Sequence, residues 1–170
     1  MADDIILARM RAARVQPHAF PSTLESINQK LLAKLVEDKR YTLGPGGLVS
    51  YLIAGKRKAK VSPSTVCHVF AKMLVIQGKK VFCTSIAELA HRGEMEEVTE
   101  RMGTGYFVIS DVSENTKNCS PFEWDSVQAL LLSHVGRGGG LIIGSANFQE
   151  VEFGDDFLSA LPAFEAIDVV

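Results

Sequence analysis

Asp111 is the residue of this sequence whose type and position most directly suggest chemistry. It follows Ser110 and the apolar run from Tyr106 to Ile109, which shows no alternation of polar and apolar residues. Such a run is typical of a strand that is buried on both faces of a parallel sheet. Ligands bind at the carboxyl ends of parallel strands, and a carboxylate there can hold Mg²⁺ through water. Asp is also favoured as the cap of a following turn, so the neighbouring segments must decide between the two roles.

A loop that joins an apolar run to a helix forms the second candidate site. Residues 48–54 predict a buried strand, and residues 66–76 predict a strongly apolar helix with Ser64 or Thr65 near its start. Gly78 is expected to cap the end of this helix, with Lys79 and Lys80 as favourable charges at the negative end of its dipole. A strand, a glycine and a loop that opens a helix with Ser or Thr are the layout of a phosphate-binding P-loop. The residues that this layout would assign to a nucleotide are Gly55, Lys58, Lys60, Ser62, Ser64 and Thr65.

The match of this loop to the pattern G-x-x-x-x-G-K-[ST] is only partial. Counting from Gly55 places Lys60 where the second glycine belongs and Val61 where the lysine belongs. Ser62 takes the Ser/Thr place, which supplies a Mg²⁺ ligand. Pro63 follows, at a position that an ordinary helix start would leave free. The side chain in the phosphate cradle and the missing lysine both predict that ordinary ATP binding is damaged.

Positive charge is concentrated in the same loop. Four cations occupy five positions, and they are Lys56, Arg57, Lys58 and Lys60. These cations could meet a phosphate from another direction or bind a nucleic-acid backbone, and a solvated basic loop is the plainer alternative. The glycine-rich stretch 136–140 predicts a flexible hinge, and its Arg137 is a further candidate contact for nucleic acid.

Length and composition limit the class of protein. The 170 residues suffice for about one domain with a full core, and 46% hydrophobic and 22% charged residues describe a soluble globular protein. A net charge of −2 does not by itself require a nucleic-acid partner. The three cysteines lie far apart and outside any Cys-x-x-Cys spacing, so we expect free thiols in a reducing cytoplasm. No apolar run approaches the roughly 18 to 20 residues of a membrane span, so we expect neither a signal peptide nor a membrane anchor.

The apolar pattern predicts the elements that must position these candidates. Helices are expected at residues 4–14, 24–36, 86–90 and 121–135, and strands at 48–54, 81–85, 106–109, 141–147 and, at a sheet edge, 166–170. This alternation predicts a three-layer α/β sandwich with a mostly parallel sheet. We expect residues 1–43 to form an N-terminal helical segment packed on or flanking a core of residues 44–170. The first helix is interpreted as a solvated or frayed terminus, with a partner-binding or DNA-binding arm as the alternative.

Asn147 ends one of these strands with a polar side chain. If strands 106–109 and 141–147 are parallel neighbours, Asn147 lies at the same sheet edge as Asp111. A polar residue there can position a water against a γ-phosphate, and a turn-forming Asn is the plainer alternative.

The order of these segments resembles the AAA+ core of the bacterial helicase loaders and transposition helper ATPases of the DnaC/IstB type. The resemblance covers about residues 45–170 and rests on the loop 55–65, the segment 80–89, the run into Asp111 and the strand that ends in Ser-Ala-Asn. It implies a P-loop NTPase fold with ATP and Mg²⁺ as cofactors. It also implies that Asp111 is the Walker B magnesium ligand, that Ser62 is the second protein ligand of the metal, and that Asn147 is sensor I.

The sequence departs from this family at the residues that hydrolyse ATP. The acid that polarises the attacking water corresponds to Val112, and Glu114 comes two positions late. The glycine and the lysine of the phosphate loop are replaced, no arginine follows Arg137 to act as an arginine finger, and we expect no C-terminal lid domain. An arginine finger alone contributes on the order of 10³ to 10⁵ in rate, so we predict little or no ATP hydrolysis.

The sequence therefore predicts a degenerate AAA+ module, a pseudo-ATPase that acts in DNA replication or recombination. Its expected partners are a replicative helicase, another AAA+ ATPase, DNA, or a second copy of itself in a homo-oligomer. One alternative is an active ATPase of the helicase-loader kind that uses Lys58 or Lys60 for the lost lysine and Glu114 as the base. Another alternative is an interaction domain that binds neither ATP nor DNA.

Overall fold

A computed structural model provides the structure of the chain. It describes residues 2–21, 50–55, 62–90, 97–101, 103–112, 119–145, 157 and 164–169. The predicted helix 24–36, most of the short helix expected near residue 157, and the expected boundary between residues 43 and 44 lie outside these residues. Within them, no helix is long and apolar enough to cross a membrane.

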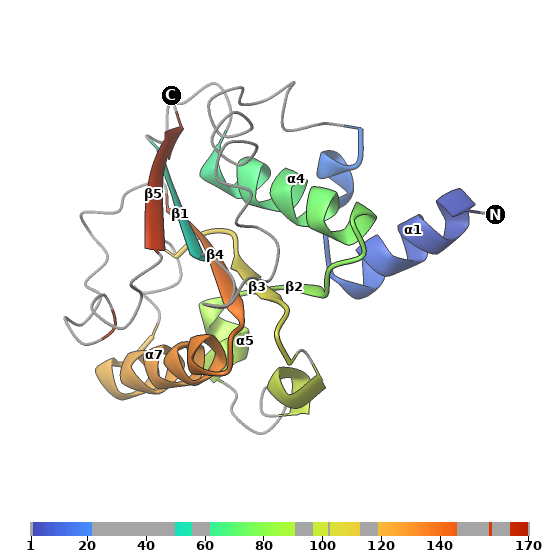
Figure 1. Ribbon diagram of the computed structural model, residues 1–170. Coiled ribbons are helices and arrows are strands. Elements are labelled where there is room, and N and C mark those ends of the chain that lie inside the picture. The colour runs from blue at the N-terminus through green and yellow to red at the C-terminus, as the bar shows by residue number, and fades with distance from the viewer. Residues whose placement is uncertain are drawn as a thin grey trace.

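Five strands form one sheet in the order β2-β3-β4-β1-β5. Every neighbouring pair in this sheet is parallel. The α/β fold with a mostly parallel sheet is therefore confirmed, and so is the final strand at a sheet edge (Figure 1). The strands are β1 (Ser50–Gly55), β2 (Val81–Thr84), β3 (Tyr106–Ile109), β4 (Gly140–Ser145) and β5 (Phe164–Val169).

The two central strands β3 and β4 are buried on both faces. All four residues of β3 and all six of β4 are buried. This burial explains why their sequences are continuous apolar runs without alternation. It also requires covering layers of helices on both sides of the sheet.

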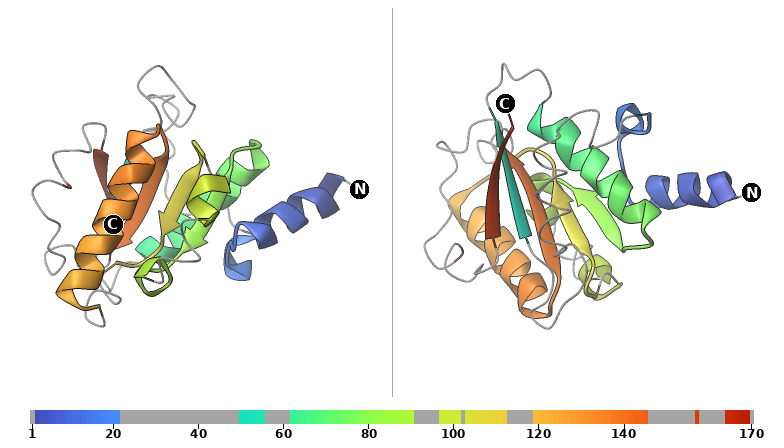
Figure 2. Two further views of the ribbon diagram at one scale, coloured as in Figure 1. Left: turned by 90° about the horizontal axis from the view of Figure 1, so that it is seen from below. Right: turned by 45° about the horizontal axis from the view of Figure 1, so that its top comes forward.

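The connections between strands place helices on both faces. The link from β1 to β2 crosses the sheet in one direction and contains α4 (Pro63–Ile76). The links from β2 to β3 and from β3 to β4 run in the opposite direction. They contain α5 (Ile86–Ala90) and α7 (Pro121–Gly136), respectively. Right-handed crossovers in opposite directions put their helices on opposite faces. The core is accordingly divided into one apolar cluster under α4 and a second under α5 and α7 (Figure 2).

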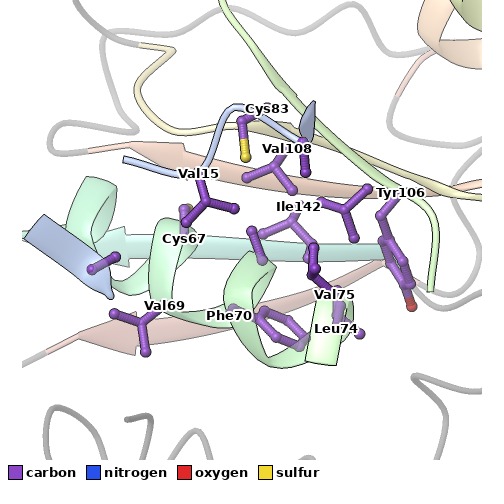
Figure 3. Packing of buried hydrophobic residues seen from close by; sticks show 14 of the residues in the cluster. Val15, Cys67, Val69, Phe70, Leu74, Val75, Cys83, Tyr106, Val108 and Ile142 are labelled. Atoms are coloured by element: carbon purple, nitrogen blue, oxygen red, sulfur yellow. The ribbon is translucent and has the colours of Figure 1, made fainter. Parts of the chain in front are cut away.

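Helix α4 contributes more buried residues to the first apolar cluster than any other element. Phe70 and Leu74 are fully buried, and Figure 3 shows them on the side of the helix that faces Val108 of β3 and Ile142 of β4. The helix ends as predicted at Gly78, which has a φ of +79° and donates its amide to the Val75 carbonyl. Together with the bond from the Lys79 amide to the Leu74 carbonyl, this makes a Schellman motif.

Helix α7 begins and ends with local capping motifs. Ser120 and Glu123 form a capping box, since the Ser120 hydroxyl accepts from the Glu123 amide at 3.2 Å and the Glu123 carboxylate accepts from the Ser120 amide at 2.8 Å. At the other end Gly138, with a φ of +90°, and Gly139 donate to helix carbonyls in a second Schellman motif. The expectation of a flexible hinge at 136–140 is therefore wrong, because these glycines terminate α7 and lead directly into β4.

The N-terminal segment packs against α4 and the edge strand β2. Helix α1 (Ala2–Ala12) and the short 3-10 helix η1 (Pro17–Ala19) place Met10, Val15 and Ala19 in the cluster under α4. Beyond α1, the Ala13 carbonyl accepts a hydrogen bond from the Cys83 amide of β2 at 2.9 Å. The interpretation of this helix as a frayed terminus is therefore wrong for its C-terminal end, although its first turn is exposed (Figure 1).

Arg14 fixes this segment to the side of β2. Its backbone is left-handed, with a φ of +58°, and its guanidinium forms an ion pair with Glu88 at 2.8 Å. The same guanidinium lies over the Phe82 ring, 4.8 Å from its centroid. Glu88 also accepts a hydrogen bond from Thr84 at 3.0 Å, so residues from three elements meet at this carboxylate.

Candidate functional site

The carboxyl ends of β1, β3 and β4 meet at one edge of the sheet. Ile109 of β3 is paired with Ile143 of β4, and Ala54 of β1 is paired with Ser145 of β4. Asp111 follows β3 by two residues, so it lies at this edge beside the end of β4. The predicted placement of Asp111 at the carboxyl end of a buried strand is confirmed.

The backbone around Asp111 is held tightly against β4. The Val112 amide donates to the Gly144 carbonyl at 2.9 Å. A Cβ atom on Gly144 would lie 2.3 Å from the Ser110 carbonyl oxygen and 2.8 Å from the Cys67 sulfur, so no side chain fits at this position. Gly144 thus allows β3 to leave the sheet directly across β4 and under α4.

The Asp111 side chain is half-buried and lies within electrostatic reach of α4. Burial raises the pKa of the Cys67 thiol on α4, and the neighbouring Cys83 and the Asp111 carboxylate raise it further. Cys67 lies in the second turn of α4, and its sulfur and the Ser110 carbonyl oxygen would both lie within 3 Å of a Cβ atom on Gly144, so the residue before Asp111 is close to this turn. The structure thus brings Asp111 close to the helix that the sequence assigns to phosphate binding.

The start of α4 differs from the predicted one. The helix begins at Pro63 rather than near Val66, and its cap is Ser62. The Ser62 hydroxyl accepts from the Thr65 amide at 3.2 Å and lies 3.0 Å from the Thr65 hydroxyl. The expectation that Pro63 obstructs a helix start is wrong, because proline is well suited to the first helical position, where no intrahelical amide bond is needed.

This capping arrangement reduces the number of amides that could bind a phosphate. Pro63 has no amide hydrogen, and the Thr65 amide is bonded to Ser62. Within the described residues of the first turn, Ser64 is left as the residue whose amide the cap does not use. A phosphate at a helix N-terminus depends on several such amides, so the described part of this site fits a triphosphate poorly.

The remaining predicted site residues are only partly described. Gly55 is the last residue of β1 and is paired with Val169 of β5. The parallel pairing of β3 with β4 satisfies the condition under which Asn147 would lie at the same edge as Asp111. The other candidates, which are Lys56, Arg57, Lys58, Lys60, Glu114 and Asn147, lie outside the described residues and stay predictions.

Arg137 lies at the opposite end of the sheet from this edge. It caps the end of α7, just before β4 begins at Gly140, whereas the basic loop follows the carboxyl end of β1. A six-residue strand such as β4 spans roughly 20 Å. Arg137 and the loop that begins after Gly55 would therefore make two separate contacts with DNA rather than one.

The sequence alone did not reveal a cavity at the amino ends of the strands. This cavity of about 410 Å³ is lined by residues from α1, from the end of α4 and from the start of β2. Its lysines were interpreted only as favourable charges at a helix C-terminus. No local motif signals the cavity, because it exists only once α1 packs beside β2.

Comparisons with known proteins identify the fold of this chain. No family model matches the sequence, and no curated protein matches it. Among solved structures, the chain is similar to a DNA replication initiation factor, with a TM-score of 0.60 and 13% identity over 86% of this chain. It is also similar to the replication initiator DnaA bound to AMPPCP and single-stranded DNA, with a TM-score of 0.62 and 14% identity over 91% of this chain. Domain III of DnaA from Thermotoga maritima is similar as well, with a TM-score of 0.58 and 13% identity over 92% of this chain.

The extent of these similarities limits what they show. The chain spans 49% and 50% of the first two structures and 68% of the third. Identities this low support the fold alone, and the narrower resemblance to the DnaC/IstB type stays a prediction. The chain shares the parallel α/β fold of these solved structures.

Proposed function

We propose that this chain is a degenerate AAA+ module of DNA replication or recombination that binds a helicase, a related ATPase or DNA and hydrolyses little or no ATP. The AAA+ fold supports the first part of this proposal, together with similarity to solved structures that are described as replication initiators. The narrower partners come from the resemblance of the sequence to helicase loaders.

The observation that carries the proposal is the start of α4. In this helix the cap formed by Ser62 and the proline at position 63 remove two of the first-turn amides from phosphate binding. The sequence also has Lys60 where the second glycine of the phosphate loop belongs and Val61 where its lysine belongs. Loss of amides and loss of the lysine act in the same direction and weaken binding of a triphosphate.

The position after Asp111 supports a loss of hydrolysis. Val112, at the place of the family's catalytic acid, is 1% exposed and packs in the cluster under α5 and α7. An apolar side chain in this place cannot accept a proton from an attacking water. Asp111 itself keeps the carboxylate that a magnesium ion would need.

The first experiment measures whether this edge of the sheet binds nucleotide. Isothermal titration calorimetry with Mg²⁺-ATP would be run on the unchanged protein, on Asp111→Asn, and on Asp125→Asn as a control that removes an exposed carboxylate from α7. We expect no saturable binding at millimolar nucleotide. Binding that is lost in Asp111→Asn but kept in the control, followed by measurable phosphate release, would replace the proposal with the active ATPase that uses Lys58 or Lys60 and Glu114.

A second experiment tests the DNA half of the proposal. Fluorescence anisotropy with a labelled oligonucleotide would compare the unchanged protein with a variant in which Lys56, Arg57, Lys58 and Lys60 are all alanine. Removal of four phosphate contacts should weaken binding. The slope of log K against log salt should become less negative by about 3 to 4. Equal binding by both proteins would remove the basic loop as the DNA contact and leave a protein partner.

A further inference from the structure

A cavity at the amino ends of the strands has the composition of an anion-binding site. It has a volume of about 410 Å³ and is formed where the second half of α1, the end of α4 and the start of β2 come together (Figure 1). Arg9, Lys79 and Lys80 contribute cations to its lining, and none of the lining residues is acidic. It is separate from the Asp111 site, which lies beyond the other end of the strands.

Helix capping does not account for these three cations. The last carbonyls of α4 accept from the amides of Gly78 and Lys79, and those of α1 accept from the amides of Ala13 to Val15. These carbonyls are thus satisfied by the main chain and need no side-chain cation as a cap. The Lys80 ammonium donates instead to the Arg101 carbonyl, at 3.4 Å. Within the described residues, the ion pair near the cavity joins Arg14 to Glu88 and does not involve Arg9, Lys79 or Lys80.

The rest of the cavity lining is mostly apolar. Val75, Val81 and Phe82 line it, and the Phe82 ring carries the Arg14 guanidinium on one face. A site with an apolar wall and a few converging charged groups is typical of small-molecule pockets, whose volumes range from about 300 to 1,000 Å³. The ligand therefore combines an anionic group with an organic part of moderate size.

Three cations in one lining favour an anion that carries more than one negative charge. A phosphate monoester carries about −1.5 to −2 at neutral pH and offers three acceptor oxygens, more than a carboxylate. An arginine matches phosphate oxygens with its planar fork, and lysines add mobile point charges. We propose that this cavity binds the phosphate of a nucleotide-sized ligand, either a free nucleotide or one unit of a single strand, through Arg9, Lys79 and Lys80.

The test measures binding of three probes to the full chain. Calorimetry would use sodium pyrophosphate and ADP without magnesium, and anisotropy would use a labelled oligothymidylate. In the variant with Arg9, Lys79 and Lys80 changed to alanine, we expect at least a tenfold loss of affinity for the bound probe. For the oligonucleotide, the slope of log K against log salt should also become less negative by about 0.7, the value for one phosphate of a single strand. Tighter binding of the oligonucleotide than of ADP would identify a strand as the source of the phosphate, and the reverse would identify a free nucleotide.

Two further variants separate the cavity from general charge and from folding defects. Ala12→Trp fills the cavity from an exposed position of α1 without changing the charge. This variant should also lose affinity for the probe. Arg11→Ala removes a cation from the same helix outside the cavity and should bind as the unchanged protein does. Asp111→Asn should bind the probe normally, which distinguishes this site from the nucleotide site at the other end of the sheet. The proposal is overturned if no probe binds, or if the alanine variant and Ala12→Trp both bind normally.

Discussion

The pH dependence of stability should be dominated by His68 between pH 7 and pH 4.5. This side chain is 4% exposed, and its Nδ1 atom accepts a hydrogen bond from the Gln16 amide at 3.3 Å. Burial is the main reason why the pKa of His68 is lowered to about 4, and the charge of the nearby His18 lowers it further. Protonation would both bury a charge and remove the acceptor that holds the N-terminal segment on α4.

The sign and size of the effect follow from proton linkage. The unfolded chain protonates this histidine near pH 6.5 and the folded protein near pH 4, so between these values the unfolded state binds more protons. The free energy of unfolding is therefore highest above pH 6.5, falls as the pH is lowered, and stops falling for this group below pH 4. From pH 7 to pH 4.5 the loss is about 2 to 3 kcal/mol at about 1.36 kcal/mol per pKa unit. Such a loss is a large part of the about 5 to 15 kcal/mol that stabilises a typical domain.

Urea unfolding followed by the fluorescence of the single tryptophan, Trp124, measures this loss. His68→Asn replaces the ring by an amide whose oxygen can still accept from Gln16, so the variant should lose much less stability between the two pH values. His18→Gln should keep most of the pH dependence, because burial is the larger cause of the shifted pKa. The pKa of the buried His134 is also lowered, and its contribution is common to all three proteins. An equal loss in the unchanged protein and in His68→Asn would refute the reasoning.

Three further predictions concern packing, capping and thiol chemistry. Gly144→Ala should lower the free energy of unfolding by about 2 kcal/mol or more, because its Cβ would lie 2.3 Å from the Ser110 carbonyl oxygen, and a loss under about 0.5 kcal/mol would contradict this packing. Ser120→Ala should cost about 1 kcal/mol in chemical denaturation through loss of the capping box on α7, and an unchanged midpoint would show that the cap is not formed. In the native protein, Cys119 should react with a thiol reagent before Cys67, because Cys67 is fully buried and burial raises its pKa, and mass spectrometry of the first modified peptide decides the order.

The strands were predictable because each is encoded locally. The runs in β3 and β4 are short and show no alternation of polar and apolar residues, which is typical of strands in a sheet covered on both faces. The order of the strands was not predictable, since placing β1 between β4 and β5 depends on pairings between residues far apart in the sequence, such as Leu52 with Ile143. The structure supplies this order, and the order brings Asp111 to α4.

The N-terminal segment shows where sequence patterns fail. The predicted helix 4–14 contains three arginines, all of them exposed in the structure, which is typical of a solvated terminus. What holds it are long-range contacts, including the bond between Ala13 and Cys83 and the ion pair between Arg14 and Glu88. Neither partner indicates the other in sequence, because the two lie about 70 residues apart.

The end of a helix was predictable where a single glycine follows an apolar helix. It was not predictable where the same residues suit both a helix end and another structure. Gly78 was recognised as a C-cap from a single glycine after an apolar helix. The glycines at 138 and 139 occur in a richer stretch that equally suits a linker, and only the hydrogen bonds to α7 show that they cap it. Pro63 was misinterpreted for a related reason, since a proline can end one helix or begin another.

Helix α4 is the element that both candidate sites share. Cys67, in its second turn, lies beside Gly144 and the Ser110 carbonyl, whereas Val75 and Gly78 at its other end line the cavity. A helix of 14 residues is about 20 Å long. Its buried face packs on the sheet along its whole length, so the helix is held as a rigid body and each site keeps its own geometry. The two sites also differ in composition. The site near the start of α4 has a carboxylate and few free amides, whereas the cavity near its end has three cations and no acidic residue. Under the two proposals, a phosphate is bound by the three cations near the end of α4 rather than by the amides at its start.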